Sequence, residues 1–148
     1  MYGMKIDTNC LLFEKTHADA KLPVKNHSDD TGYDVHCVED KVIPARGSAI
    51  VNVGLKFANI PEGYWIRIEC RSGLGFKHGI QPHPGIIDNG YRSDAGIKLY
   101  NLTDTDYHVK TGDRIAQFVL YPLIHFPVEF GLPTDSERGE KGFGSSGN

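Results

Sequence analysis

The chain has 148 residues, with 17 glycines, 8 prolines and a formal net charge of −3. This length is typical of a single domain whose core is large enough to fold without disulfide staples. The small net charge of mixed sign excludes a basic face for duplex nucleic acid. A polyanionic ligand would therefore need a few focused arginine and lysine side chains.

The N-terminal stretch MYGMKIDTNCLLFEK contains no apolar run long enough for a signal peptide or a membrane span. The three cysteines form no C-x-x-C motif, and the seven histidines do not stand at metal-ligand spacings. We therefore expect a soluble, intracellular protein of the cytoplasm (for a viral protein, of the host cytoplasm or nucleus) with reduced thiols. We expect no membrane association and no transition-metal site built by the protein.

Short β-type runs between turn residues dominate the middle of the chain. They lie at 47–60, with one glycine break, and at 63–70, 95–102, 114–123 and 125–130. The one expected helix is a turn or two within SGLGFKHG, with Ser72 as its N-cap. Many short strands at this spacing predict an all-β sandwich or barrel.

Hydrophobicity is lost from about Asp135 onward, so we expect a β domain over 1–134 and an arm over 135–148. The arm contains G-x-G-x-x-G at 142–147, but no helix can follow it as a dinucleotide fingerprint requires. An idle chain end is one interpretation. Three features instead favour an arm that closes over a nucleotide. Arg138 offers a planar guanidinium to an anion, the glycines offer backbone N–H groups, and Phe143 can stack on a base.

Arg71, Ser72 and Gly73 stand where a strand gives way to the expected helix. A guanidinium, a hydroxyl and free helix-terminal amides make an anion site. A capped helix with a surface arginine is the alternative.

Asp88 follows an apolar run and precedes Asn89-Gly90, a pair that favours a tight hairpin turn. A carboxylate held at the mouth of a hairpin can act as a general base on water, and a turn-forming aspartate is the alternative. Tyr91, beyond the turn, can pack flat against a sugar or serve as an ordinary cross-strand aromatic.

Five segments in order resemble the motifs of the trimeric dUTP pyrophosphatase (dUTPase) family. They are TGYDV (31–35), RSGLGFKHGI (71–80), GIIDNGYRSDAGIKLYN (85–101), GDRIAQFVL (112–120) and RGEKGFGSSG (138–147). The resemblance implies a distorted β-barrel or jelly-roll subunit with one short helix and a flexible C-terminal arm. It also implies a homotrimer with active sites between subunits, each closed by an arm.

The resemblance implies a Mg²⁺-dependent hydrolase that converts dUTP to dUMP and pyrophosphate, keeps uracil out of DNA and supplies dUMP for thymidylate synthesis. Asp88 matches the carboxylate that activates water, and Tyr91 matches the ring that packs on deoxyribose. The remaining substrate-binding positions are Arg71, Ser72, Gly73 and Gln117 for phosphate, Gly85, Ile87 and Gly96 for uracil, and Arg138, Phe143, Gly144 and Ser145 in the arm. Mg²⁺ is expected on the triphosphate without direct protein ligands, its water shell supported by Asp34.

The chain departs from the usual family pattern at Thr31, Cys70, Ser93, Asp94 and Lys141, none of which removes a chemical group that the reaction needs. Two alternatives differ in function. A dCTP deaminase shares the resemblance up to the hairpin but needs a glutamate where this chain has Lys98. A non-catalytic dUTP-binding or regulatory protein would have no need of the carboxylate at Asp88.

Overall fold

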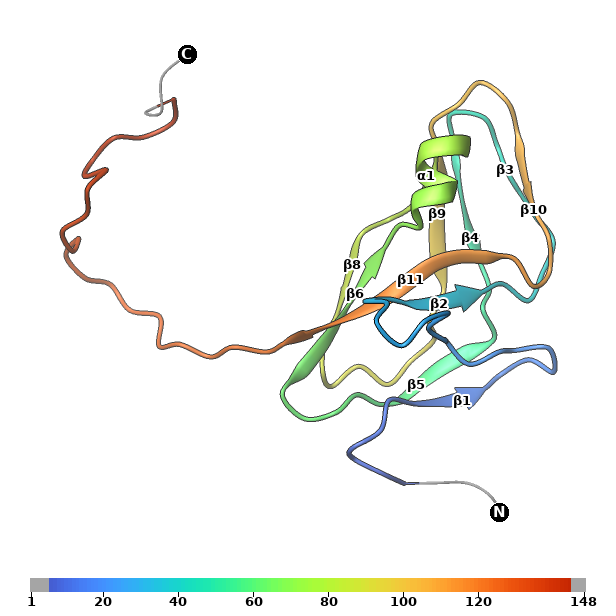
Figure 1. The fold of residues 1–148 in the computed structure, drawn as a ribbon, viewed down its shortest axis with the longest axis horizontal. Coiled ribbons are helices and arrows are strands. Elements are labelled where there is room, and N and C mark those ends of the chain that lie inside the picture. Colours follow the sequence, from blue (N-terminus) through green and yellow to red (C-terminus); the bar gives the residue numbers. More distant parts are fainter. Residues whose placement is uncertain (1–5, 145–148) are drawn as a thin grey trace.

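The computed structural model describes residues 6–144, which form β-strands with one short helix (Figure 1). In chain order the elements are β1 (Leu12–Lys15), β2 (Tyr33–His36), β3 (Lys41–Ile43), β4 (Ser48–Val51), β5 (Leu55–Asn59), β6 (Tyr64–Glu69), α1 (Ser72–His78), β7 (Ile80–Pro82), β8 (Gly85–Ile87), β9 (Ile97–Asn101), β10 (Tyr107–Val109) and β11 (Arg114–Pro122). The expectation of an all-β fold with one short helix is confirmed.

The strands form two larger sheets and two ribbons. The larger sheets have the orders β2-β11-β6-β8 and β4-β9-β7, and the ribbons pair β1 with β5 and β10 with β3. All of the pairings are antiparallel. Across residues 6–144 these sheets do not close into a continuous barrel, so the jelly-roll alternative describes the fold better.

Both larger sheets bury one side in a common hydrophobic core. Ile66 and Phe118 reach it from the four-stranded sheet, and Ile97 and Leu99 reach it from the three-stranded sheet. All four side chains are almost completely buried. This alternation of buried and exposed positions is what the sequence pattern predicted for 63–70.

Glycine lies at two element boundaries. Gly54 separates β4 from β5 with φ of 69°, and a Cβ there would lie 2.8 Å from Cβ of His17, so the predicted glycine break is confirmed. Gly79 ends α1 in the left-handed conformation. The expectation that Ser72 caps the helix is wrong: Ser72 is its first residue, and Arg71 is the N-cap without a side-chain cap bond.

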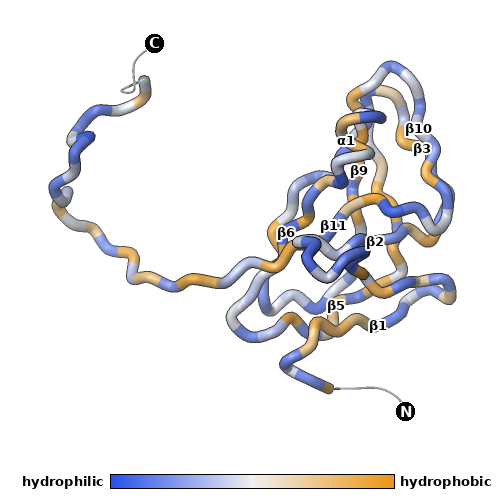
Figure 2. The backbone as a smooth tube through the Cα atoms, viewed as in Figure 1, coloured by the Kyte–Doolittle hydropathy of each residue, from blue (hydrophilic) through white to orange (hydrophobic). Residues whose placement is uncertain are grey.

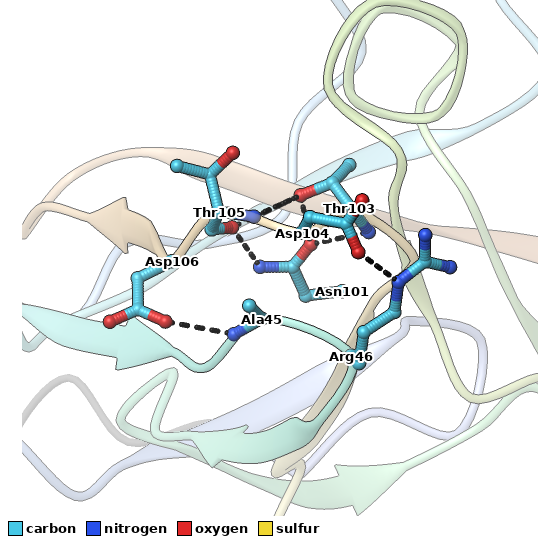
Figure 3. Close-up of polar contacts among 7 residues, drawn as sticks. All are labelled: Ala45, Arg46, Asn101, Thr103, Asp104, Thr105 and Asp106. Atoms are coloured by element: carbon cyan, nitrogen blue, oxygen red, sulfur yellow. Dashed lines mark hydrogen bonds and ion pairs between the residues drawn. The ribbon is translucent and has the colours of Figure 1, made fainter.

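The buried Asn101 side chain fastens the loop after β9 to the end of β3. Its amide donates to the carbonyls of Ile43 and Thr105, at 2.9 and 2.8 Å, and its Oδ1 accepts from the Thr103 hydroxyl at 2.7 Å. Figure 3 shows the contacts with Thr103 and Thr105. Nearby, Arg46 Nε lies 2.8 Å from Asp104 Oδ1. The network fixes the two loops beside α1.

The chain leaves the body after β11 (Figure 1). The Leu123 amide donates to the Gly63 carbonyl at 2.7 Å, and every residue from 124 to 144 is exposed. Figure 2 shows that the first part of this extended segment is rich in hydrophobic residues. They include Phe126 (80% exposed), Val128 (96%) and Phe130 (109%).

The expectation of a strand at 125–130 is therefore wrong. Alternating apolar and polar residues indicate that a segment is able to form a strand. The strand forms only where a neighbouring strand supplies hydrogen bonds to its backbone. Within the described part of the chain no neighbouring strand pairs with this segment.

Candidate active site

The register of the four-stranded sheet gathers three of the motifs. In the β2–β11 pair Asp34 lies opposite Gln117, and in the β11–β6 pair Gln117 lies opposite Glu69. Residues directly opposite one another project to the same face of a sheet. Because α1 begins just beyond the end of β6, Arg71 and Ser72 arrive at the same edge as Asp34 and Gln117.

These residues line an open polar cleft of about 230 Å³. Its walls are Asn26, Asp30, Thr31, Gly32, Asp34, Arg71, Ser72 and Gln117. Gln117 Nε2 donates to the Cys70 carbonyl at 2.9 Å, which holds the amide at the cleft wall. A Cβ on Gly32 would fall 1.9 Å from Gln117 Oε1, so this position admits only glycine while Gln117 stays in place.

Asp34 is the buried centre of the cleft wall, with 8% of its surface exposed. Its Oδ1 lies 3.2 Å from Arg71 Nε, and its Oδ2 lies 3.3 Å from Arg114 Nη1 and 3.2 Å from Asn26 Nδ2. Asn26, Asp30 and Arg114 were not predicted as site residues. The motif GDRIAQFVL contains Arg114, but only the strand register reveals that it meets Asp34.

His36 lies opposite Arg114 in the β2–β11 pair. Burial is the largest cause that lowers the pKa of His36 below 6.5; Lys21 and Arg114 lower it further, and Asp34 acts in the opposite direction. Its Nδ1 is buried without a hydrogen-bond partner among the described residues. Protonation of the His36 imidazole is therefore less favourable than that of an exposed histidine.

Asp88 and Tyr91 occupy a tight turn at a different place. The Tyr91 amide donates to the Asp88 carbonyl at 3.0 Å, and the Asp88 side chain is exposed. The expectation of a hairpin is wrong, because β8 pairs with β6 and β9 pairs with β4 and β7. The usual Asn-Gly hairpin turn requires a positive φ at the glycine, and Gly90 does not have one. The turn instead leads the chain from one sheet to the other.

Tyr91 is held at both ends of its side chain. The ring packs edge-on against Phe57, with centroids 5.7 Å apart, and the hydroxyl donates to the Asp94 carbonyl at 2.7 Å. Phe57 belongs to the core, so the turn is anchored to the centre of the fold.

Three further predicted positions lie on either side of this turn. Gly85 and Ile87 are the ends of β8, and Gly96 is exposed just before β9. No residue from 85 to 96 lines the polar cleft. A single chain therefore holds the predicted base and the predicted phosphate residues at separate loci.

The predicted arm residues lie in the exposed segment beyond the body. Arg138 Nε donates to the Lys141 carbonyl at 2.9 Å, and its Nη2 donates to the Gly142 carbonyl. Phe143 is fully exposed, and Gly144 has φ of 78°. Ser145 lies outside the described residues.

Within residues 6–144 no group of three or more histidine, cysteine or acidic side chains could hold a metal ion. No helix of this part of the chain is long and apolar enough to cross a membrane. Oxygen donors are nevertheless present in the polar cleft, in the side chains of Asn26, Asp30 and Asp34.

The sequence matches the dUTPase family model over residues 18–147. The chain belongs to the dUTPase family. The resemblance drawn from the five motifs is thereby confirmed, and with it the enzyme class, a nucleotide hydrolase. Deoxyuridine 5'-triphosphate nucleotidohydrolases of Kluyveromyces lactis and Paramecium bursaria Chlorella virus 1 are 39% and 41% identical to it. The alignments cover 95% of both chains in the first case, and 93% of this chain and 97% of the relative in the second.

Solved dUTPases share the fold. The dUTPase of Staphylococcus bacteriophage 80alpha with dUpNHpp superposes with a TM-score of 0.82 at 30% identity, over 95% of this dUTPase and 99% of that chain. A variant of the Staphylococcus aureus phage phi11 dUTPase, described with a structural Mg(II) ion, has a TM-score of 0.77 at 25% identity. That match covers 86% of this chain and 100% of the phage chain.

Proposed function

We propose that this dUTPase hydrolyses dUTP to dUMP and pyrophosphate, with phosphate bound in the polar cleft and Asp88 as the general base. The observation that carries the proposal is the convergence of Arg71, Ser72 and Gln117 on one cleft, brought about by the sheet register. A guanidinium, a hydroxyl and an amide N–H are the donors that a triphosphate requires. Gly73, next along α1, adds a backbone position beside them.

The chemistry needs no covalent nucleophile. The oxygen of a water molecule bonds to the α-phosphorus as the bond from that phosphorus to the bridging oxygen breaks, and pyrophosphate departs. Asp88 accepts the water proton, and its exposed carboxylate at a fixed turn suits that task. Arg71 and Ser72 stabilise the charge that grows on the leaving pyrophosphate.

Tyr91 selects the sugar. Its ring is fixed by Phe57 and its hydroxyl by Asp94, so a 2′-hydroxyl that needed its space could not displace it without breaking both contacts. The backbones of Gly85, Ile87 and Gly96 read the uracil edge.

The cleft suits a hydrated Mg²⁺ carried by the triphosphate, because the side-chain oxygens of Asp30, Asp34 and Asn26 can accept hydrogen bonds from its water shell. When bound with the triphosphate it would neutralise phosphate charge. Asp34 would accept hydrogen bonds from the water shell of Mg²⁺ with the oxygen lone pairs that are not used by the two arginines. Asp30 is a second carboxylate beside it in the cleft.

The complete site is assembled from three copies of the chain. Two observations support this. The turn with Asp88 and the phosphate cleft lie apart in one subunit, and the segment 124–144 is exposed along its whole length. In a trimer, the turn of one subunit faces the cleft of the next, and an arm closes over both. Arg138 and Ser145 then contact the terminal phosphates, Gly144 allows close approach, and Phe143 stacks on the base.

Replacement of Asp88 by asparagine tests the proposal. The variant is expected to bind dUpNHpp as the unmodified protein does and to lose about 10²–10⁴-fold in single-turnover rate with dUTP, the usual contribution of a general base. Asp104→Asn, at an exposed aspartate of the loop after β9, is the control. A loss of less than about tenfold in the Asp88 variant would exclude this carboxylate as the base.

A further inference from the structure

Asp34 is shared between two arginines. Its two carboxylate oxygens receive one arginine each, Oδ1 from Arg71 Nε at 3.2 Å and Oδ2 from Arg114 Nη1 at 3.3 Å. Arg71 Nη1 also donates to the Arg114 carbonyl at 3.5 Å. We name Asp34, Arg71 and Arg114 the arginine clamp. Its members come from β2, the N-cap of α1 and β11, so it joins three of the family motifs.

Only one of the two arginines of the clamp lines the polar cleft. Arg71 lines the polar cleft, whereas Arg114 does not. Arg114 lines the adjoining hollow of about 300 Å³, with Leu74, Tyr107 and Asp113, and Arg71 borders that hollow as well. Arg114 thus contacts the Asp34 carboxylate from the side of the hollow, while Arg71 lines both the hollow and the polar cleft. Arg114 can therefore act on the cleft only through its contact with Asp34.

The charges of the clamp explain why a second arginine is needed. Asp34 alone would neutralise Arg71, and the Asp30 carboxylate on the same cleft would then leave it negative toward a triphosphate. With Arg114 the clamp carries two cations and one anion, and its one remaining positive charge offsets Asp30. Of the nearby titratable groups, Asp113 in the hollow has its carboxylate bonded to the Lys110 amide at 2.9 Å. Burial lowers the pKa of His36, which disfavours a positive charge there. Burial of Asp34 keeps solvent from screening these interactions fully.

We propose that Arg114 is a positioning residue for the triphosphate: by occupying Asp34 it orients the Arg71 guanidinium and leaves the positive charge of Arg71 available to the phosphates. The inference rests on the proposed function. Its specific consequence is that Arg114 contributes to binding of the phosphate chain and contributes nothing to binding of the nucleoside.

Two variants at this position separate charge from shape. Arg114→Gln removes the positive charge, and Arg114→Lys keeps it without the planar fork. Calorimetry with dUpNHpp is expected to show affinity in the order Arg, Lys, Gln, with roughly tenfold or more lost in the Gln variant, since charge-assisted bonds are the strong ones. Binding of deoxyuridine, which has no phosphate, is followed by NMR titration and should not change. Lys41→Gln, at an ion pair on β3, is the matched control.

A double variant shows whether Arg114 acts through Asp34. If it does, adding Arg114→Gln to Asp34→Asn weakens dUpNHpp binding by much less than it does in the unmodified protein. Additive losses, unchanged dUpNHpp affinity in the Gln variant, or an equal loss for deoxyuridine would each overturn the inference. If the Gln variant does not fold, the Lys variant decides in the same way, and unchanged dUpNHpp affinity there overturns it. Failure of the unmodified protein to bind dUpNHpp would instead overturn the proposed function.

Discussion

At the scale of single residues, the contact between Gly32 and Gln117 couples the first motif to the fourth. A methyl group on Gly32 would meet the end of the Gln117 side chain, with Oε1 at 1.9 Å and Cδ at 2.7 Å. The end of a flexible side chain can move where a backbone cannot. The cost of a larger residue therefore falls on the position of the Gln117 amide and hence on phosphate binding.

Gly32→Ala is expected to lower kcat/KM for dUTP by roughly tenfold, about the worth of one charge-assisted hydrogen bond, with little change in melting temperature. Gly75→Ala, inside α1 where a Cβ meets nothing within 4 Å, is the control and should leave kcat/KM unchanged. Steady-state kinetics and thermal melts check both. A large drop in melting temperature together with unchanged kinetics would contradict the interpretation.

His36 gives the fold a dependence on acid. Burial lowers its pKa below 6.5 in the folded chain, whereas the unfolded chain takes up a proton near 6.5. The unfolded state therefore binds more protons as the pH falls through this window, and the contribution of His36 to stability, full above it, is lost toward acid.

We expect His36→Gln to flatten the fall in unfolding free energy between about pH 7.5 and 5.5. Urea titrations at several pH values measure this slope, and His108→Gln, at an exposed position of β10, should leave it unaltered. Equal slopes in the His36 variant and the unmodified protein would show that the imidazole is not the titrating group.

At the scale of elements, the sequence pattern identified the strands that face the core, because burial on one side imposes the alternation of 63–70. The pattern gave wrong predictions where the pairing of strands determines the structure. The segment 125–130 alternates but has no partner, and Asn89-Gly90 predicted a hairpin although β8 and β9 belong to different sheets. The contribution of Arg114 was likewise invisible, since only the β2–β11 register brings it to Asp34. The motif residues of the cleft were predictable because they lie within short contiguous segments.

The turn from Asp88 to Tyr91 depends on two anchors of the Tyr91 side chain, and two substitutions separate them. Tyr91→Phe keeps the ring on Phe57 and loses only the bond to the Asp94 carbonyl. It should keep discrimination against UTP. Tyr91→Ala also opens the space of the ring, and its preference for dUTP over UTP should fall by about 10–200-fold, the range for one lost packing contact. The ratio of kcat/KM for the two nucleotides measures this, and an unchanged ratio in the Ala variant would place sugar selection elsewhere.

At the scale of the whole molecule, the exposed segment after β11 has two parts of different chemistry (Figure 2). The part near the body contains Phe126, Val128, Phe130 and Leu132, all at least 80% exposed. The distal part is polar and glycine-rich apart from Phe143. In the proposed trimer the proximal part packs on another subunit, and the distal part closes the active site. The two functions should therefore be separable by truncation.

Deletion of residues 135–148 should leave a trimer that binds dUTP with modest loss but turns it over orders of magnitude more slowly, because contacts that strengthen in the transition state affect kcat more than binding. Deletion of residues 124–148 removes the apolar part as well. Each of its large side chains is worth about 1.5–3 kcal/mol when buried, so this truncation should also shift the trimer toward smaller species. Light scattering over a dilution series reports assembly, single-turnover rates report catalysis, and calorimetry with dUpNHpp reports binding.

Phe143→Ala in the full chain should reproduce part of the catalytic loss without any change in assembly. Near-normal kcat in the shorter deletion would show that the distal part takes no part in turnover, and equal assembly of both truncated forms would show that the apolar part covers no neighbouring subunit.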